Sequence, residues 1–133
     1  MTLKVVDGGE SIALQLLVNK ITTPENAILR LYSNNLTPAE TDTAASYTEA
    51  SGGGYGAKTL AGASWTVSGT APTSIGYAEQ TFTFTASIGN VYGYYMTRST
   101  SADLIWAELF TDGPYNIVNN GDQIKITPQI TAD

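Results

Sequence analysis

Polar and apolar residues alternate most regularly between residues 76 and 110. Near the start of this stretch Phe82 and Phe84 point to one side, and the threonines around them point to the other. A period of two with aromatic and β-branched residues is typical of a half-buried strand. Residues 91–98 and 104–110 are two further predicted strands, joined by a short polar loop. The stretch therefore predicts a three-stranded meander on which the other apolar segments pack.

A helical pattern lies in residues 1–21, the predicted N-terminal helical arm. Asp7, or Glu10 with Ser11, is suited to cap this helix. Apolar residues recur at helical spacing and cover most of its circumference: Ile12, Leu14, Leu16, Leu17, Val18 and Ile21. Two interpretations stay open, because the apolar face can pack on the sheet of its own subunit or dock on a neighbouring chain.

The remaining segments predict more strands and one long loop. Residues 27–33 alternate like a strand. Residues 36–76 are rich in Thr, Ala, Ser and Gly and form a predicted loop excursion with one short strand at 65–68. The last predicted strand, residues 124–130, contains Pro128, which cannot donate to a ladder and indicates an edge or a bulge.

These elements predict a single β domain over residues 1–133, a size typical of one domain. The fold class is mainly β, a β-sandwich or jelly-roll-like domain of six to eight strands. It has one short N-terminal helix and a long Gly/Ser/Thr-rich loop.

Composition narrows the functional classes. The net charge is −6 and the 6 basic residues form no stripe, so binding to nucleic acid or to an anionic membrane is not expected. The chain has no Cys and no His, which removes disulfides, thiol chemistry and the commonest general base and transition-metal ligand. The N-terminus lacks a basic-then-apolar leader, and no apolar run reaches membrane-spanning length, so we expect synthesis and assembly in a cytoplasm.

Motifs for catalysis are weak. Residues 52–59, GGGYGAKT, approach a phosphate-binding loop, but Ala57 replaces its last glycine and the flanks suit neither the strand nor the helix that the loop requires. Acids that could form a carboxylate pair stand in or beside turns, Glu40 with Asp42 and Glu108 with Asp112. We predict no catalytic residue and no cofactor.

A calcium site is the one metal site to consider, because only oxygen ligands are present. Asn119, Asn120 and Asp122 could bind Ca²⁺, but the acidic 12-residue calcium loop is absent and a turn explains these residues better. No metal is predicted.

Tyrosine and tryptophan remain as candidate binding residues. Tyr92, Tyr94 and Tyr95 lie in the meander, Tyr47 and Tyr55 lie in the loop excursion, and Trp65 and Trp106 are the two tryptophans. Such residues pack in cores, form centres of protein interfaces and line sugar-binding platforms. A protein interface is favoured over sugar binding, since no polar cluster accompanies them.

Five segments carry a family resemblance, and in order they are ILRLYSNNLTPAETDTAASYTEASGGGYGAKTL, Trp65, FTFTA, VYGYYMTRSTSADLIWAELF and GDQIKITPQI. Their order resembles that of small virion proteins of tailed bacteriophages, of the capsid decoration or cement type. The apolar segment ahead of Ile28 is similar to the opening helix of that family.

The resemblance implies a non-enzymatic structural protein on the capsid surface. Such proteins commonly form trimers and bind across seams between major capsid protein subunits. The contact residues that we expect from their exposure are Leu14, Leu17, Val18, Tyr47, Tyr55 and Lys58. One alternative is a tail, baseplate or fibre module that binds host carbohydrate through Tyr and Trp, and another is a free carbohydrate-binding module.

Overall fold

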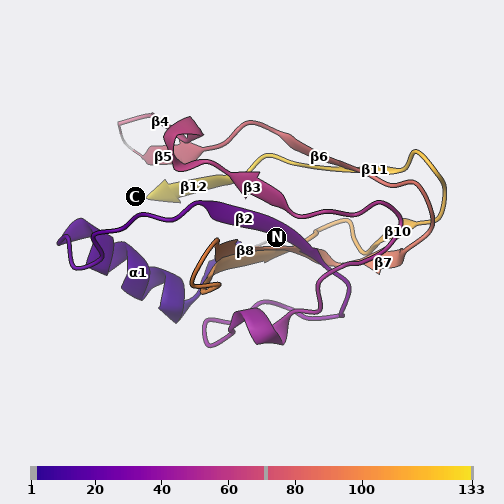
Figure 1. Cartoon of the computed structure of the whole chain (residues 1–133), viewed down its shortest axis with the longest axis horizontal. Helices are drawn as coiled ribbons and strands as arrows, with labels where there is room; N and C mark the ends of the chain where they lie inside the picture. Colours follow the sequence, from indigo (N-terminus) through magenta and orange to yellow (C-terminus); the bar gives the residue numbers. More distant parts are fainter. Residues whose placement is uncertain (1–2, 71, 133) are drawn as a thin grey trace.

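A computed structural model describes residues 3–70 and 72–132 of the chain. These residues form a mainly β, sandwich-like domain with an α-helix near the N-terminus (Figure 1), which confirms the predicted fold class. Twelve strands lie within the described residues, more than the sequence predicts.

The larger layer is an antiparallel five-stranded sheet with the order β1-β9-β8-β2-β3. Its strands are β1 (Leu3–Val5), β9 (Leu104–Leu109), β8 (Gly93–Arg98), β2 (Ala27–Tyr32) and β3 (Lys58–Leu60). The predicted meander strands β8 and β9 pair as a hairpin, and β2 adds to the other edge of β8 along six register positions. β2, β8 and β9 therefore form the centre of this sheet. The predicted three-stranded meander is wrong for its first strand, because β6 (Gln80–Thr83) pairs with β11 (Gln123–Ile126) in the other layer and not with β8.

The second layer consists of shorter strands that lie above the first in Figure 1. One pair is β6 (Gln80–Thr83) with β11 (Gln123–Ile126), and a three-stranded group contains β4 (Thr66–Ser68), β5 (Thr73–Gly76) and β12 (Gln129–Ala132). A further small pair joins β7 (Gly89–Val91) to β10 (Tyr115–Ile117).

Pro128 divides the predicted C-terminal strand into two. β11 ends at Ile126 and β12 begins at Gln129, and the two pair with different strands. Because proline has no N–H for a ladder, the pairing is interrupted here, although the Pro128 carbonyl still accepts a hydrogen bond from the Tyr77 amide at 2.9 Å. The predicted irregularity is thus a complete break between strands.

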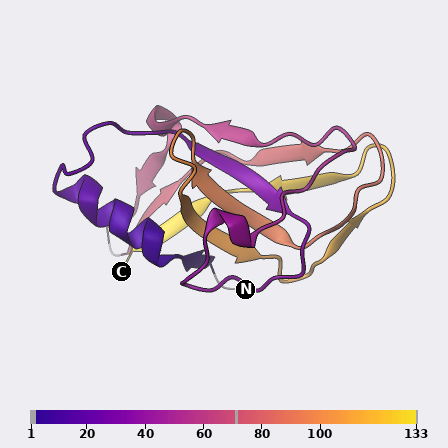
Figure 2. The ribbon, with the colours of Figure 1, turned by 60° about the horizontal axis from the view of Figure 1, so that its bottom comes forward.

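Two apolar clusters lie on opposite faces of the five-stranded sheet. The cluster between the layers includes Leu29, Leu31 and Met96 with Phe82 and Phe84. The second cluster, on the outer face, is covered by the segment that contains the 3₁₀ turn η1 (Ala44–Ser46), which lies in front of the sheet in Figure 2. Its buried members are Val6, Tyr32, Tyr47, Tyr95, Leu104 and Ala107. The central strands are therefore buried on both faces.

A β-bulge interrupts the simple alternation of side chains in β9. Simple alternation places Leu104 and Trp106 on one face, but Trp106 pairs with Met96 and Leu104 pairs with Thr97, so the register shifts between them. As a result Trp106 packs between the layers, whereas Leu104 packs in the outer-face cluster. A bulge of one residue reverses the direction of every side chain beyond it.

The predicted loop excursion at 36–76 is more ordered than expected. Besides η1 it contains β3, the 3₁₀ turn η2 (Gly62–Ser64), β4 and β5, of which only β4 overlaps the strand predicted at 65–68. β3 forms because its edge pairs with β2, with Leu60 opposite Ala27 and fully buried. Tertiary pairing here overrides a composition typical of loops.

Candidate protein interface

Among the described residues, the helix α1 (Asp7–Leu17) and the residue after it carry four of the eight large apolar side chains that are exposed. The arm predicted at 1–21 contains this helix but begins with strand β1, which pairs with β9. Its N-cap is Val6 and has no side-chain cap, so neither predicted capping residue caps the helix, and Asp7 is its first residue. Asp7 and Glu10 still lie in the first turn, where carboxylates interact favourably with the helix dipole.

The C-terminal end of α1 closes with a Schellman arrangement. Asn19 adopts a left-handed conformation with φ 57°, and its amide donates to the Leu16 carbonyl at 3.1 Å. The Lys20 amide donates to the Gln15 carbonyl at 2.8 Å. These bonds satisfy the last carbonyls of the helix and reverse the chain toward β2.

The close approach of Gly9 holds the start of α1 against β9. Gly9 is buried, and a Cβ built on it would lie 2.1 Å from the Ile105 carbonyl oxygen. The Val6 amide donates to the same carbonyl at 3.3 Å. The first turn is thus fixed on the sheet, and the rest of the helix extends along one end of the domain (Figures 1 and 2).

Substitution by alanine is expected to have opposite effects on stability at the neighbouring glycines Gly8 and Gly9. Gly9→Ala should lower the free energy of unfolding by about 1–3 kcal/mol, because the new methyl group would clash with backbone. At Gly8 the nearest atom to a built Cβ is 3.7 Å away. Gly8→Ala should therefore raise the free energy of unfolding by about 0.5–1 kcal/mol, because alanine has the higher helix propensity. Urea unfolding of both variants checks this, and a Gly9→Ala protein as stable as wild type would contradict the described contact.

The interpretation in which α1 packs its apolar stripe on its own sheet is wrong for most of the helix. Leu14 is 65% exposed, Leu17 79% and Val18 71%, and Leu16 is also exposed. Ile12 and Ile21 are only half-buried. The three interface residues predicted on α1 are therefore accessible and adjacent, as a docking surface requires.

A shallow groove of about 590 Å³ runs along this surface. Its apolar lining is Leu14, Leu17 and Val18. Its polar lining is Asp7, Glu10, Ser11, Gln15 and Lys20. We call these residues together the α1 face.

The prediction that Tyr47 is an exposed contact residue is wrong, because its side chain is buried. Only 6% of the residue is accessible, and its ring stacks on Tyr95 with centroids 5.0 Å apart. Its hydroxyl donates to the Asp42 carboxylate at 2.7 Å. Burial, followed by this hydrogen bond, raises the pKa of Tyr47. Tyr47 anchors the segment with η1 to the sheet and is not available as a surface contact.

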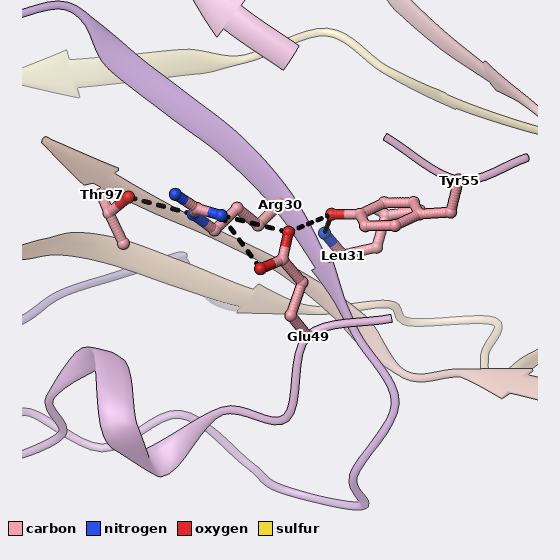
Figure 3. Close-up of polar contacts among 5 residues, drawn as sticks. All are labelled: Arg30, Leu31, Glu49, Tyr55 and Thr97. Atoms are coloured by element: carbon pink, nitrogen blue, oxygen red, sulfur yellow. Dashed lines mark hydrogen bonds and ion pairs between the residues drawn. The ribbon is translucent and has the colours of Figure 1, made fainter. Parts of the chain in front are cut away.

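Tyr55 is half-buried and belongs to a polar network across the sheet (Figure 3). Its hydroxyl donates to Glu49 at 2.9 Å and accepts the Leu31 amide at 3.1 Å. The β2–β3 ladder ends at Leu29, so Tyr55 provides the partner that the Leu31 amide lacks in the sheet. Arg30 completes the network, with contacts of 2.9 and 3.1 Å to Glu49 and of 3.2 Å to the Thr97 hydroxyl.

Tyr55→Phe is expected to lower the free energy of unfolding by about 1–3 kcal/mol, because it leaves the buried Leu31 amide without a partner. Tyr115→Phe is the matched control. Tyr115 is 38% exposed and its hydroxyl makes no hydrogen bond within the described part of the chain, so its effect should stay within about 0.5 kcal/mol. Equal effects of the two variants in urea unfolding would contradict the role of the Tyr55 hydroxyl.

Lys58 is half-buried and also contacts the core. Its Nζ atom lies 5.4 Å from the centre of the Phe82 ring, on which Tyr55 stacks at 5.9 Å. The structure therefore brings Tyr55 and Lys58 together around one core ring, whereas Leu14, Leu17 and Val18 gather on α1. The six predicted contact residues do not form one surface.

Most of the aromatic residues considered for sugar binding are buried. Tyr94, Tyr95 and Trp106 are in the core. Trp65 is half-buried and lines a pocket of about 280 Å³ with Trp106, Ile75 and Ile105 among others. The rings thus serve mainly as packing partners, although Trp65, Tyr92 and Tyr55 are half-buried and Trp65 also lines this pocket.

The candidate ligand loops have structural roles. The Asp122 carboxylate accepts the amides of Val118 and Asn119 at 3.0 and 2.9 Å, and these bonds lower its pKa. This is the turn predicted there. Residues 52–59 lead into β3 instead of a helix, so the context of a phosphate-binding loop is missing. Within residues 3–70 and 72–132, no group of three or more acidic side chains is placed to hold a metal ion.

Three residues that matter here were not predicted as such from the sequence: Glu10 and Lys20, which line the α1 face, and Gly9, which holds the helix against β9. Glu10 and Lys20 could have been found from their spacing, since they flank the apolar residues at helical intervals. Gly9 gives no such signal, because its role depends on the position of β9.

Among the helices of the described residues, none is long and apolar enough to cross a membrane.

A comparison with protein families, with curated proteins and with solved structures found no match to this chain.

Proposed function

We propose that the protein is a non-enzymatic structural protein of a bacteriophage virion, a capsid decoration or cement protein. In this role it binds between major capsid protein subunits on the capsid surface and stabilises the head. The proposal rests on the family resemblance and on the α1 face. In this proposal the protein is made in the host cytoplasm and assembles on the capsid there.

The α1 face is the observation that carries the proposal. Its three central apolar side chains are mostly exposed although the domain has a large core that other apolar residues fill. Contiguous apolar patches on a folded domain mark binding surfaces for protein partners. The first turn of α1 is held against β9, so the face is presented in a fixed orientation.

A decoration protein needs repeated weak contacts more than one strong contact. Many copies on one shell gain avidity, because each additional contact is intramolecular. Binding to the assembled shell alone also stabilises that shell by mass action. The α1 face, with a short apolar centre and a polar rim, suits such a contact.

A census of purified virions by cryo-electron microscopy tests the proposal. We expect many symmetry-related copies on the capsid, and particles that lack the protein should lose tolerance to heat or osmotic shock. A few copies at the tail, or none in any particle, would overturn the decoration role. Equally robust particles without the protein would remove the stabilising role.

Capsid binding by surface variants identifies the contact. Leu14→Lys should reduce binding to capsids that lack the protein by at least tenfold, as for a central interface residue. The new lysine lies four residues after Glu10, a favourable helical pair, so the helix itself is preserved. Val118→Lys is the matched control, because Val118 is 53% exposed and follows β10 at the other end of the domain (Figure 1).

The second candidate function is a tail or fibre module that binds host carbohydrate. The pocket beside Trp65 favours it, since an accessible indole is a common sugar platform. Titration with sugars should then change tryptophan fluorescence, and Trp65→Ala should abolish the change. The decoration role predicts no change.

A further inference from the structure

The α1 face carries opposite charges at its two ends. Asp7 and Glu10 lie at the N-terminal end of the groove and Lys20 lies at the other. The 11 residues of α1 span about 16 Å, so these charges are well separated along the groove. Between them the centre of the face is apolar.

Glu10 and Lys20 are available for a partner. Both residues are exposed, and within the described side chains neither forms an ion pair or a side-chain hydrogen bond. A partner that matches the whole face therefore presents an apolar centre, a positive end near Glu10 and a negative end near Lys20. A second α1 face in the reverse direction has this pattern.

We propose that the α1 faces of two copies of this chain pack antiparallel around a two-fold axis. Leu14 of each copy packs beside Leu17 of the other, and Glu10 of each copy lies near Lys20 of the other. The inference rests on the proposed function and specifies its contact: on the shell the α1 face joins neighbouring copies to each other, so that Leu14→Lys weakens capsid binding by removing this mutual support. A two-fold contact of this kind is self-complementary and closes on two copies.

The charges decide against a parallel arrangement. Three copies around a three-fold axis with parallel helices would place the acidic ends together and the three Lys20 side chains together. Like charges at an interface oppose association. The face therefore favours a dimer through α1 over the trimer that the family resemblance implies.

The contact is expected to be weak in solution. A stable interface buries about 800 Å² on each partner, and one short helix face offers less. The apolar centre provides the affinity, whereas exposed ion pairs add little and mainly select the direction. We expect a dissociation constant on the order of 10–100 μM, which suits an element that acts at the high local concentration of a shell.

Sedimentation velocity of the purified full chain over a concentration series gives the first test. We expect a monomer–dimer equilibrium, and Leu17→Glu should remain monomeric up to several hundred micromolar. Circular dichroism of this variant checks its fold, which should be retained because Leu17 is exposed. Val118→Glu is the matched control and should dimerise like wild type.

Charge exchange tests the direction. Glu10→Lys and Lys20→Glu should each weaken the dimer at least threefold, because each puts like charges together at both ends of an antiparallel pair. The double variant should restore the wild-type affinity. In a parallel arrangement all three variants would keep like charges together and associate as wild type does.

A monomer at the highest concentration, a trimer, or a dimer insensitive to charge exchange would overturn the inference. The virion census separates these results from the proposed function. A monomeric protein that is present in many copies on the capsid overturns only the inference. A charge-sensitive dimer that is absent from virions overturns only the decoration role.

Discussion

Raising the pH above about 10 is expected to unfold the protein in one cooperative step. Of its 8 tyrosines, Tyr32, Tyr47, Tyr55, Tyr94 and Tyr95 have a pKa raised above the ordinary value of 10.0, to about 12 for Tyr95. Burial is the main cause for all five. Three of them also donate their hydroxyl protons to carboxylates, those of Asp42, Glu49 and Glu108.

The sign of the pH dependence follows from these shifts. An unfolded tyrosine loses its proton near pH 10, whereas the folded protein holds the five protons to higher pH. The contribution of the buried phenols to the free energy of unfolding is therefore fully present below pH 10. It is lost as the pH rises from 10 toward the folded pKa values.

The expected effect is large because the five groups act together. Each contributes about 1.4 kcal/mol per pH unit above the unfolded pKa, or roughly 7 kcal/mol per unit for five. A domain of ordinary stability, about 5–15 kcal/mol, then unfolds within about one to two pH units.

Ultraviolet absorbance of tyrosinate and near-ultraviolet circular dichroism, recorded on the same samples, provide the measurement. The late rise in tyrosinate absorbance should coincide with the loss of the dichroism signal, and return to neutral pH is the control for chemical damage. If all tyrosines ionised while the native dichroism persisted, the buried hydroxyl network would be contradicted.

Phe84→Ala is expected to lower the free energy of unfolding by about 3–5 kcal/mol, because the ring is fully buried between the layers. The backbone around it cannot collapse easily into the resulting cavity. The Phe84 amide donates to the Asp122 carbonyl at 2.8 Å, and its carbonyl accepts the Gly121 amide at 2.7 Å. Urea unfolding at neutral pH measures the loss.

Two variants control for this prediction. Phe84→Leu keeps most of the apolar volume and should cost markedly less than the alanine variant. Val67→Ala removes an exposed apolar side chain from β4 and should stay within about 0.5 kcal/mol. A Phe84→Ala protein that unfolds at the wild-type urea concentration would show that the ring does not fill the core as described.

Local alternation predicted the strands at the centre of the fold. Phe82 and Phe84 are buried and Thr83 and Thr85 are exposed, as their period of two indicates. β2, β8 and β9 occupy the predicted segments because their side chains meet apolar neighbours on a pleated surface. For such strands, the order of polar and apolar residues in the strand itself is enough to predict which side chains are buried.

Elements that depend on distant partners could not be predicted in this way. β3 has a polar, glycine-rich approach and exists because the edge of β2 is available. The burial of Tyr47 depends on Tyr32 and Tyr95, which belong to other segments. The bulge in β9 could not be predicted either, because the alternation of residues along one strand does not show where its register with the neighbouring strand shifts.

The candidate interface was predictable in part. Helical spacing indicated Leu14, Leu17 and Val18 as one apolar face but could not show what covers it. That answer depends on how the helix meets the sheet, which is set by the contact of Gly9 with Ile105.

The position of α1 in the chain has a mechanical consequence. The helix is preceded by β1 and followed by β2, and both strands belong to the five-stranded sheet. A force applied to α1 would therefore be transmitted at both of its ends into one sheet, where hydrogen bonds between strands resist shear together. A helix connected to the sheet at one end only could separate from the domain by breaking its contacts one after another. The exposed helix is thus connected to the same sheet through the strands on both sides of it.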